Sequence, residues 1–299
     1  LLGMERFRQG ADLHFDRHDG EAVTTEEFLC SMEDATGAEL TQFRNWYSVA
    51  GTPVIEVSGI YDSNKKIYTL KTKQSGNLAW QDEEIRAFQI PFKIGLLDSV
   101  GKDMRFSAKD SDTADIDDTN GYSVVLDLNK QEQEFVLSNV TEKPLPSLLR
   151  GFSAPVKLNY AYSRDELTFL MSYDSDSFNR WEAANRLATQ ILLEISGFVE
   201  NETEIFIDER LIEAVGANLR LALDEQKDAS YDKAMLANML TLPTEAYLID
   251  ASSVANVDAI SQARQILKRE LALRFENQFY DIFWQNDLSG PYSPDGESI

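Results

Sequence analysis

The first fifty residues place apolar side chains at the three- and four-residue spacing of α-helices. Residues 4–18 form the first such pattern, and an Asp-Gly pair directly after them provides a stop. Thr24, with Glu27 three residues later, is a capping-box signature, because the hydroxyl and the carboxylate can each pair with a free backbone N–H. The sequence therefore predicts a second helix that ends near Ala35 and a third over residues 40–47.

From Val54 onward the apolar period changes to two, which indicates β-strands. Tyr68 and Leu70 alternate with Lys71 and Lys73, as expected of a strand with one solvent-exposed face. Segments rich in β-branched and aromatic residues predict strands over residues 54–60, 67–74, 90–97, 122–128, 134–140 and 156–162. Six or more strands within about 110 residues predict an antiparallel β-sandwich.

The helical period returns after Ser177 and persists through most of the remaining chain. The pattern predicts helices over residues 178–192, 210–223, 231–240 and 257–284. Successive amphipathic helices joined by short polar links favour a helical bundle or an α-solenoid. Pro291 and Pro294 then end the part of the pattern that can be interpreted.

Composition narrows the class of protein and its partners. A chain of 299 residues is long enough for two or three domains. Its 51 acidic and 28 basic residues give a formal charge of −23, which repels phosphate backbones and anionic lipids, so we expect neither nucleic acid nor membrane partners. No apolar run reaches the roughly 18 to 20 residues of a membrane span.

The one cysteine, Cys30, cannot close a disulfide within the chain, which fits a reducing compartment. The sequence thus predicts a cytoplasmic protein. Cys30 lies within the second helical pattern beside apolar residues, so we interpret it as a packing residue without a reactive role.

The two histidines, His14 and His18, are four residues apart on the first predicted helix. At that spacing both imidazoles can face one metal ion. The zinc-peptidase motif H-E-x-x-H requires a glutamate directly after the first histidine as the general base, whereas this chain has Phe15 there. We interpret both as structural or surface histidines, and a metal site is the alternative.

Two acidic stretches suggest calcium ligands but do not match the EF-hand pattern. In residues 110–121, Asp115 takes the place of the required glycine and Gly121 that of the required glutamate. In the stretch that starts at Asp174, Phe178 fills the fifth ligand position. We predict a solvated acidic loop at each. Nucleophile-elbow, Walker and C-x-x-C motifs are also absent, so residue chemistry alone predicts no active site.

Collinear short runs provide a more specific signal than any single motif. They are FDRHDG at 15–20, FRNWYS at 43–48 followed by GTP at 51–53, FSAPVKL at 152–158, FNRWEAA at 178–184 and LTLP at 240–243. In this order the runs resemble the bacterial branch of the aminopeptidase N family, zinc metallopeptidases of the gluzincin group. The resemblance extends from the first residues to beyond Leu242.

The resemblance implies a multi-domain α and β fold. Residues 1–47 would be the C-terminal tail of a thermolysin-like catalytic domain, residues 48–158 an Ig-like β-sandwich, and residues 159–299 the first part of a C-terminal α-helical superhelical domain. It also implies a parent enzyme that uses zinc and removes N-terminal amino acids from peptides. The present residues would enclose substrate as an internal fragment, with the remainder of the same polypeptide as their partner.

In the family, the zinc-binding helix, the third-ligand glutamate, the G-A-M-E-N loop and the transition-state tyrosine all precede the position that corresponds to Leu1. We therefore predict no catalytic, cofactor-binding or metal-ligating residue in this chain, and no activity of the fragment alone. By this account, apolar side chains of residues 1–47 lack their partners, among them Phe7, Phe15, Phe28, Met32 and Trp46.

Two other readings remain open. A β-sandwich followed by an α-solenoid could be a non-catalytic module that recognises a protein partner. An H-E-x-x-H region upstream in the same reading frame would favour the aminopeptidase, and its absence would favour this module. The chain could also be a small metallohydrolase that uses His14 and His18, and zinc-dependent turnover by the 299 residues would show this.

Overall fold

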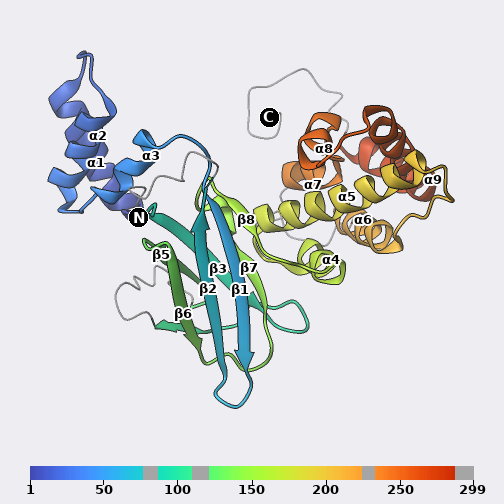
Figure 1. The fold of residues 1–299 in the computed structure, drawn as a ribbon, viewed down its shortest axis with the longest axis horizontal. Coiled ribbons are helices and arrows are strands. Elements are labelled where there is room, and N and C mark those ends of the chain that lie inside the picture. The colour runs from blue at the N-terminus through green and yellow to red at the C-terminus, as the bar shows by residue number, and fades with distance from the viewer. Residues whose placement is uncertain (77–86, 110–120, 224–232, 287–299) are drawn as a thin grey trace. The chain divides into compact units, whose positions relative to one another are not determined.

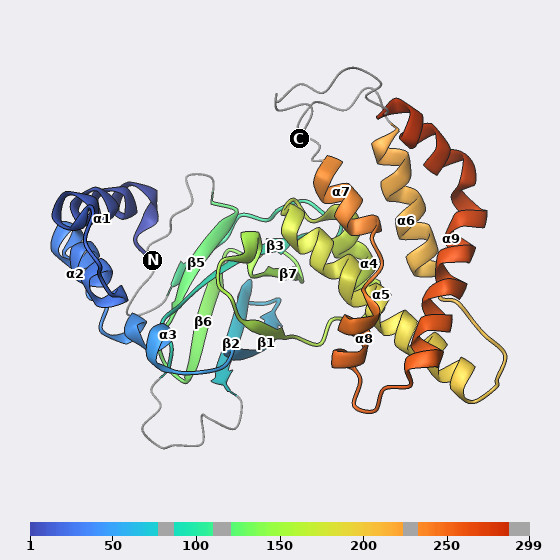
Figure 2. The same ribbon diagram turned by 90° about the horizontal axis from the view of Figure 1, so that it is seen from above.

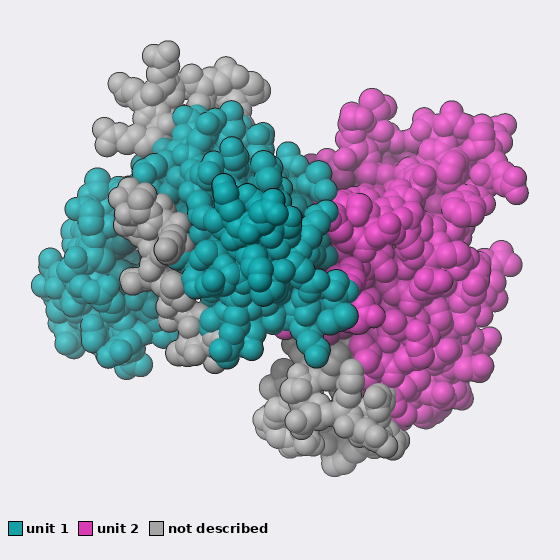
Figure 3. All heavy atoms as spheres, turned by 90° about the horizontal axis from the view of Figure 1, so that it is seen from below, with its two compact units in different colours: residues 1–161 teal, residues 162–299 magenta. Residues whose placement is uncertain are grey.

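The computed structural model describes residues 1–76, 87–109, 121–223 and 233–286. These residues form two compact units, Leu1–Ala161 and Tyr162–Ile299, which are coloured separately in Figure 3. The division into three parts, 1–47, 48–158 and 159–299, stays a prediction. Within the described ranges, no helix is both long enough and apolar enough to span a lipid bilayer.

The first unit begins with two helices that pack against each other, α1 (Gly3–His18) and α2 (Thr25–Thr36) (Figure 1). The predicted capping box is present at the start of α2, where the Glu27 carboxylate accepts from the Thr24 N–H at 2.8 Å. Gly37 ends this helix in the left-handed conformation, which glycine adopts without a steric penalty. Both predicted helices are therefore confirmed.

A small apolar core holds this helical pair together. Leu29, Met32 and Leu40 are its buried members, and five partly buried residues pack around them, namely Leu2, Ala11, Phe28, Ala38 and Phe43. Met32 is only 2% exposed, so the expectation that it lacks partners is wrong. Phe7 and Phe15, in contrast, are 49% and 66% exposed, as expected.

The third predicted helix is a short 3₁₀ turn, η1 (Gln42–Arg44), followed by a single α-turn, α3 (Asn45–Ser48). The Gln42 side-chain amide donates to the carbonyls of Ala87 and Asn129, both at 2.7 Å. Trp46 donates from its indole N–H to the Gln89 carbonyl at 2.9 Å and packs edge-on against Phe88. Trp46 thus has partners within the chain, contrary to the sequence expectation.

The strands of the described residues form two sheets (Figure 1). One sheet has the order β4-β6-β2-β1-β8 and the other the order β5-β3-β7. The strands are β1 (Val54–Asp62), β2 (Ile67–Ser75), β3 (Ile90–Leu97), β4 (Ser107–Lys109), β5 (Ser123–Leu128), β6 (Glu132–Ser138), β7 (Leu145–Leu148) and β8 (Lys157–Asn159). The predicted β-sandwich is therefore confirmed.

Strand pairing differs from the prediction at one edge. Among the strands of the described residues, all pairs are antiparallel except β1 with β8, which run parallel over residues 54–56 and 157–159. The pattern of β2 follows the predicted alternation, with Tyr68 and Leu70 buried and Lys71 and Lys73 exposed. The core between the sheets consists of fully buried side chains such as Ile55, Leu70, Phe92, Leu126 and Leu137.

The second unit is helical throughout its described part. Its helices are α4 (Arg164–Tyr173), α5 (Ser177–Glu200), α6 (Glu209–Ala222), α7 (Lys233–Leu240), α8 (Glu245–Ala251) and α9 (Val257–Gln285). The long helix α5 packs against α4, α7 and α9, and α6 packs against α4 and α9 (Figure 2). This arrangement confirms the predicted helical region and adds α4 and α8, which the sequence pattern missed.

Helix α9 is not continuous, contrary to the prediction of a single long helix. Its backbone leaves the helical region at Phe275, with φ −126° and ψ 23°. The Phe275 ring lies against Gly216 of α6, where a β-carbon would come within 2.8 Å of a ring carbon. The two helices therefore approach closely only because residue 216 has no side chain.

Candidate functional site

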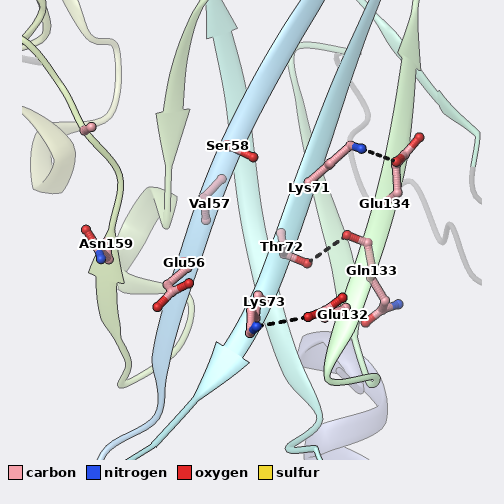
Figure 4. A pocket seen from close by; sticks show the side chains of 11 residues that line it. Glu56, Val57, Ser58, Lys71, Thr72, Lys73, Glu132, Gln133, Glu134 and Asn159 are labelled. Atoms are coloured by element: carbon pink, nitrogen blue, oxygen red, sulfur yellow. Dashed lines mark hydrogen bonds and ion pairs between the residues drawn. The ribbon is translucent and has the colours of Figure 1, made fainter.

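A hollow in the described residues lies on the solvent-exposed face of the larger sheet. Its volume is about 630 Å³, and its lining comes from β1, β2 and β6 and from the chain around β8 (Figure 4). Lys71 forms an ion pair with Glu134 at 3.2 Å, and Lys73 forms one with Glu132 at 3.1 Å. Glu56 of β1 lies opposite Lys73 in the strand register.

This hollow has the chemistry of a surface recess. All four paired side chains are about half exposed or more, so water screens their charges and each pair contributes little. The lining includes no histidine or cysteine, and the Thr72 hydroxyl donates to the Gln133 carbonyl at 3.4 Å without a neighbouring base. The recess can bind polar groups, and nothing in its lining activates a nucleophile.

The two histidines lie together on α1, as their spacing predicts. Their ring centroids are 5.2 Å apart, and the rings are inclined by 48°. The His14 ring packs edge-on against Phe28 of α2 at 5.3 Å. His18 lies in the last turn of α1, and its Nδ1 contacts a carboxylate oxygen of Glu21 at 3.0 Å. Both rings therefore have contacts within the helical pair.

Cys30 is exposed, so its interpretation as a packing residue is wrong. Its thiol contacts Glu26 at 3.6 Å, and Arg44 approaches its sulfur at 4.0 Å. Desolvation and the hydrogen bond to Glu26 raise the pKa of the thiol, and this keeps the thiolate fraction low.

Arg44 joins the 3₁₀ turn to α2. Its guanidinium bonds Glu26 at 2.6 Å and Glu33 at 2.9 Å. The hydrogen bond from Arg44 lowers the pKa of both carboxyl groups. All three charges are thus satisfied within this cluster, and its arrangement favours a structural clamp over acid–base chemistry.

The two acidic stretches have different outcomes. Residues 110–118 lie outside the described residues. Asp174, in the second stretch, is only 3% exposed, and one of its carboxylate oxygens accepts from the Asp176 N–H at 3.0 Å. Asp176 is the N-cap of α5 and accepts from Asn179 N at 2.9 Å. The prediction of a solvated loop is therefore wrong here, because Asp174 is buried and Asp176 caps the start of α5.

The donor set does not fit a catalytic zinc site in the part of the chain that the structure describes. Such a site needs three protein ligands and an open position. Across the described ranges, no three His, Cys, Asp or Glu side chains come together in a way that could hold a metal ion. Phe15 also stands directly after His14, where the H-E-x-x-H motif has the glutamate that acts as general base.

Sequence reasoning missed the polar network that links α4, α5 and α6. Arg164 bonds Asp208 at 2.9 Å and Glu194 at 2.8 Å, and Arg210 also bonds Asp208 at 2.8 Å. Asp208 is the N-cap of α6. An aspartate directly before a helical pattern is an N-cap signal, so the role of Asp208 at the start of α6 could be predicted from the sequence. Its partner Arg164 lies 44 residues away, and no local pattern predicts that contact.

Comparison with known domain families gives two adjacent matches. Residues 51–161 match a domain of unknown function with an Ig-like fold, DUF3458. Residues 164–299 match a second domain of unknown function, DUF3458_C, described as ARM repeats.

Curated relatives match almost the whole chain. Aminopeptidase N of Escherichia coli (strain K12) is 36% identical over 289 residues, which is 96% of this chain and 31% of the relative. Aminopeptidase N of Haemophilus influenzae is 31% identical over 95% of this chain, and that of Caulobacter vibrioides is 32% identical over 99%. The chain spans about a third of the length of these relatives.

Solved structures agree with the sequence comparison. The crystal structure of Legionella pneumophila aminopeptidase A in complex with aspartic acid matches with a TM-score of 0.76 and 28% identity. The match covers 99% of this chain and 31% of that structure. The chain is therefore homologous to bacterial aminopeptidase N over about 31% of that protein's length, a part that includes the Ig-like and the C-terminal ARM-repeat domains.

Proposed function

We propose that these 299 residues form a structural, substrate-enclosing segment of a zinc-dependent aminopeptidase, which removes N-terminal amino acids from peptides. The observation that carries this proposal is the collinear similarity of 96% of the chain to a region that makes up 31% of Escherichia coli aminopeptidase N. In this proposal the parent enzyme is cytoplasmic, which the single cysteine supports.

The chemistry of the described residues supports a non-catalytic role. Metal-assisted hydrolysis needs a metal-held water and a neighbouring base. The donor set of the described residues fits no catalytic zinc centre, and the sheet recess contains paired lysines and glutamates. We therefore propose that the zinc and the general base of the parent enzyme are bound or supplied by other residues of the same polypeptide.

Each part has a structural task in this proposal. Helices α1 and α2 complete the catalytic domain, which is supported by the exposed side chains of Phe7 and Phe15. The β-sandwich acts as a spacer, and the helical unit forms a wall around an interior chamber that admits short peptides. The sandwich is suited to a spacer because its buried core and its two hydrogen-bonded sheets make it stiff.

The test uses the full-length product of the reading frame that contains these residues. We expect an H-E-x-x-H region upstream, and release of N-terminal amino acids from short peptides that stops when a chelator removes the metal. Release from a long unfolded polypeptide should be at least about tenfold slower per free N-terminus, because an enclosed chamber excludes it.

The alternative, a non-catalytic β-sandwich and α-solenoid module that binds a protein partner, predicts a different result. Its reading frame would contain no H-E-x-x-H region, and its full-length product would release no amino acids with or without zinc. That outcome would overturn the proposed function. Equal rates of release from short peptides and from the long polypeptide would instead support the peptidase activity and contradict the substrate-enclosing role.

A further inference from the structure

The two histidines of α1 have the spacing of imidazoles that share one metal ion. This feature goes beyond the proposed function and does not depend on it. His14 and His18 are one helical turn apart, and their ring centroids are separated by 5.2 Å. Two imidazoles that bind one metal ion at about 2.0 to 2.1 Å from each nitrogen have centroids at about this separation. The pair is partly buried, so its rings are held by neighbours.

The partner of His18 determines which of its ring nitrogens has the proton. Nδ1 lies 3.0 Å from a carboxylate oxygen of Glu21. An ionised carboxylate only accepts hydrogen bonds, so Nδ1 of His18 is the donor. In the neutral ring Nε2 then has a free lone pair. This assignment follows from the hydrogen-bond partners.

The contact of His14 with Ser31 indicates the same tautomer, with the proton on Nδ1. Nδ1 of His14 lies 3.5 Å from the hydroxyl of Ser31 on α2. That hydroxyl has one proton, which it donates to the Glu27 carbonyl at 2.8 Å. It can therefore only accept from His14, so Nδ1 of His14 is protonated and Nε2 is again free.

We propose that His14 and His18 chelate one divalent transition-metal ion through their two Nε2 atoms, with water at the remaining positions. Imidazole is a preferred ligand of copper, nickel and zinc ions. Metal-ligating histidines almost always donate their other ring N–H to a carboxylate or another acceptor, which is the role of Glu21 and Ser31 here. The site differs from a catalytic zinc centre because it has two protein ligands, and because Phe15 stands where H-E-x-x-H has its glutamate.

Copper(II) is the most sensitive probe, because it binds nitrogen sites more tightly than the other first-row divalent ions do. The chain has a formal charge of −23, so carboxylates will also bind copper weakly. Binding is therefore followed by calorimetry for affinity and by electron paramagnetic resonance for coordinated nitrogen. Only the second measurement distinguishes imidazole from carboxylate ligands.

The experiment titrates the 299-residue chain with copper(II). We expect one equivalent bound with the spectral coupling of two nitrogens. His14→Ala and His18→Ala should each weaken this binding at least tenfold, and Glu21→Gln, which alters only the supporting acceptor, by about 10- to 100-fold. Asp16→Asn removes an exposed carboxylate of the same helix and is the matched control, which should bind as tightly as the unchanged chain.

Two results would overturn the proposal. One is a copper signal in the unchanged chain without nitrogen coupling. The other is unchanged affinity in both single histidine variants. Circular dichroism checks that each variant is folded. If His14→Ala loses its helices, the test rests on the paramagnetic resonance spectrum of the unchanged chain and on the copper affinity of His18→Ala. The outcome says nothing about peptide hydrolysis, so it is distinguishable from failure of the proposed function.

Discussion

At the scale of single residues, Arg150 shows how the sandwich accommodates a buried charge. Arg150 is 3% exposed, and its guanidinium donates to Ser147 at 2.8 Å, Ser123 at 3.0 Å and Asp103 at 2.6 Å. A buried ion pair is tolerated only when such additional hydrogen bonds satisfy its donors. The guanidinium lies directly over Gly95 of β3, where a β-carbon would come within 2.1 Å of its central carbon.

The contact predicts that Gly95→Ala destabilises the sandwich by about 1 to 3 kcal/mol, because the added methyl group displaces a fully bonded side chain. Gly197→Ala on α5 is the matched control. A β-carbon there meets no atom within 4 Å, so the change should stabilise its helix by about 0.5 to 1 kcal/mol. Hydrogen exchange of the β3 amides measures the effect of Gly95→Ala, and that of the α5 amides measures the effect of Gly197→Ala. Equal protection of β3 in Gly95→Ala and the unchanged chain would contradict the account.

At the scale of elements, Asp208 connects two helices. It begins α6 by accepting from Arg210 N at 3.1 Å, and it bonds Arg164 of α4 at 2.9 Å. Its side chain is 8% exposed. The hydrogen bond from the Arg210 guanidinium, followed by that from Arg164, lowers the pKa of Asp208 to about 2 against the opposing effect of burial.

The lowered pKa predicts the acid dependence of this helical region. The folded-state pKa lies below the ordinary value of 3.8, so the Asp208 carboxylate stabilises the fold at pH values above about 4. This contribution, on the order of 2 kcal/mol, is lost as the pH falls towards 2. Asp208→Asn should therefore lower the hydrogen-exchange protection of the α6 amides at pH 6. Near pH 2.5 the protection in this variant should approach that in the unchanged chain. A difference that stays the same at both pH values would contradict this assignment.

The elements also show which features were predictable from sequence. The capping box at Thr24 and the alternation in β2 are local signals, and both were predicted correctly. Helix α4 has the same signal at Ser163, whose capping box with Glu166 was overlooked. Strand β7 contains Pro146, which lowers strand propensity and is tolerated because β7 is an edge strand.

Other features depend on contacts between distant residues, so no local pattern contains them. Phe275, at the break in α9, contacts Gly216 of α6, and β8 pairs in parallel with β1, which is far from it in the sequence. The candidate metal pair was visible as a spacing, but the proton positions were not. That of His18 depends on Glu21, only three residues away. That of His14 depends on Ser31, which lies 17 residues from it and reaches it only because α2 packs on α1.

At the scale of the whole molecule, the described residues form a folded framework without a recognisable catalytic centre. The described residues have a β-sandwich core, capped helices and satisfied ion clusters, which are features of a stable support. The chain is similar to a region that makes up 31% of Escherichia coli aminopeptidase N. We propose that this framework alone hydrolyses no peptide, and this is our central proposal.

Hydrolysis by the purified 299-residue chain tests this claim most directly. The chain is incubated with zinc and an aminoacyl chromogenic substrate, with and without a chelator, beside the full-length product of the same reading frame. We predict no release of chromophore by the chain and chelator-sensitive release by the full-length product. Zinc-dependent release by the chain itself, lost in a His14→Ala, His18→Ala double variant, would contradict the account and identify the histidine pair as a catalytic metal site.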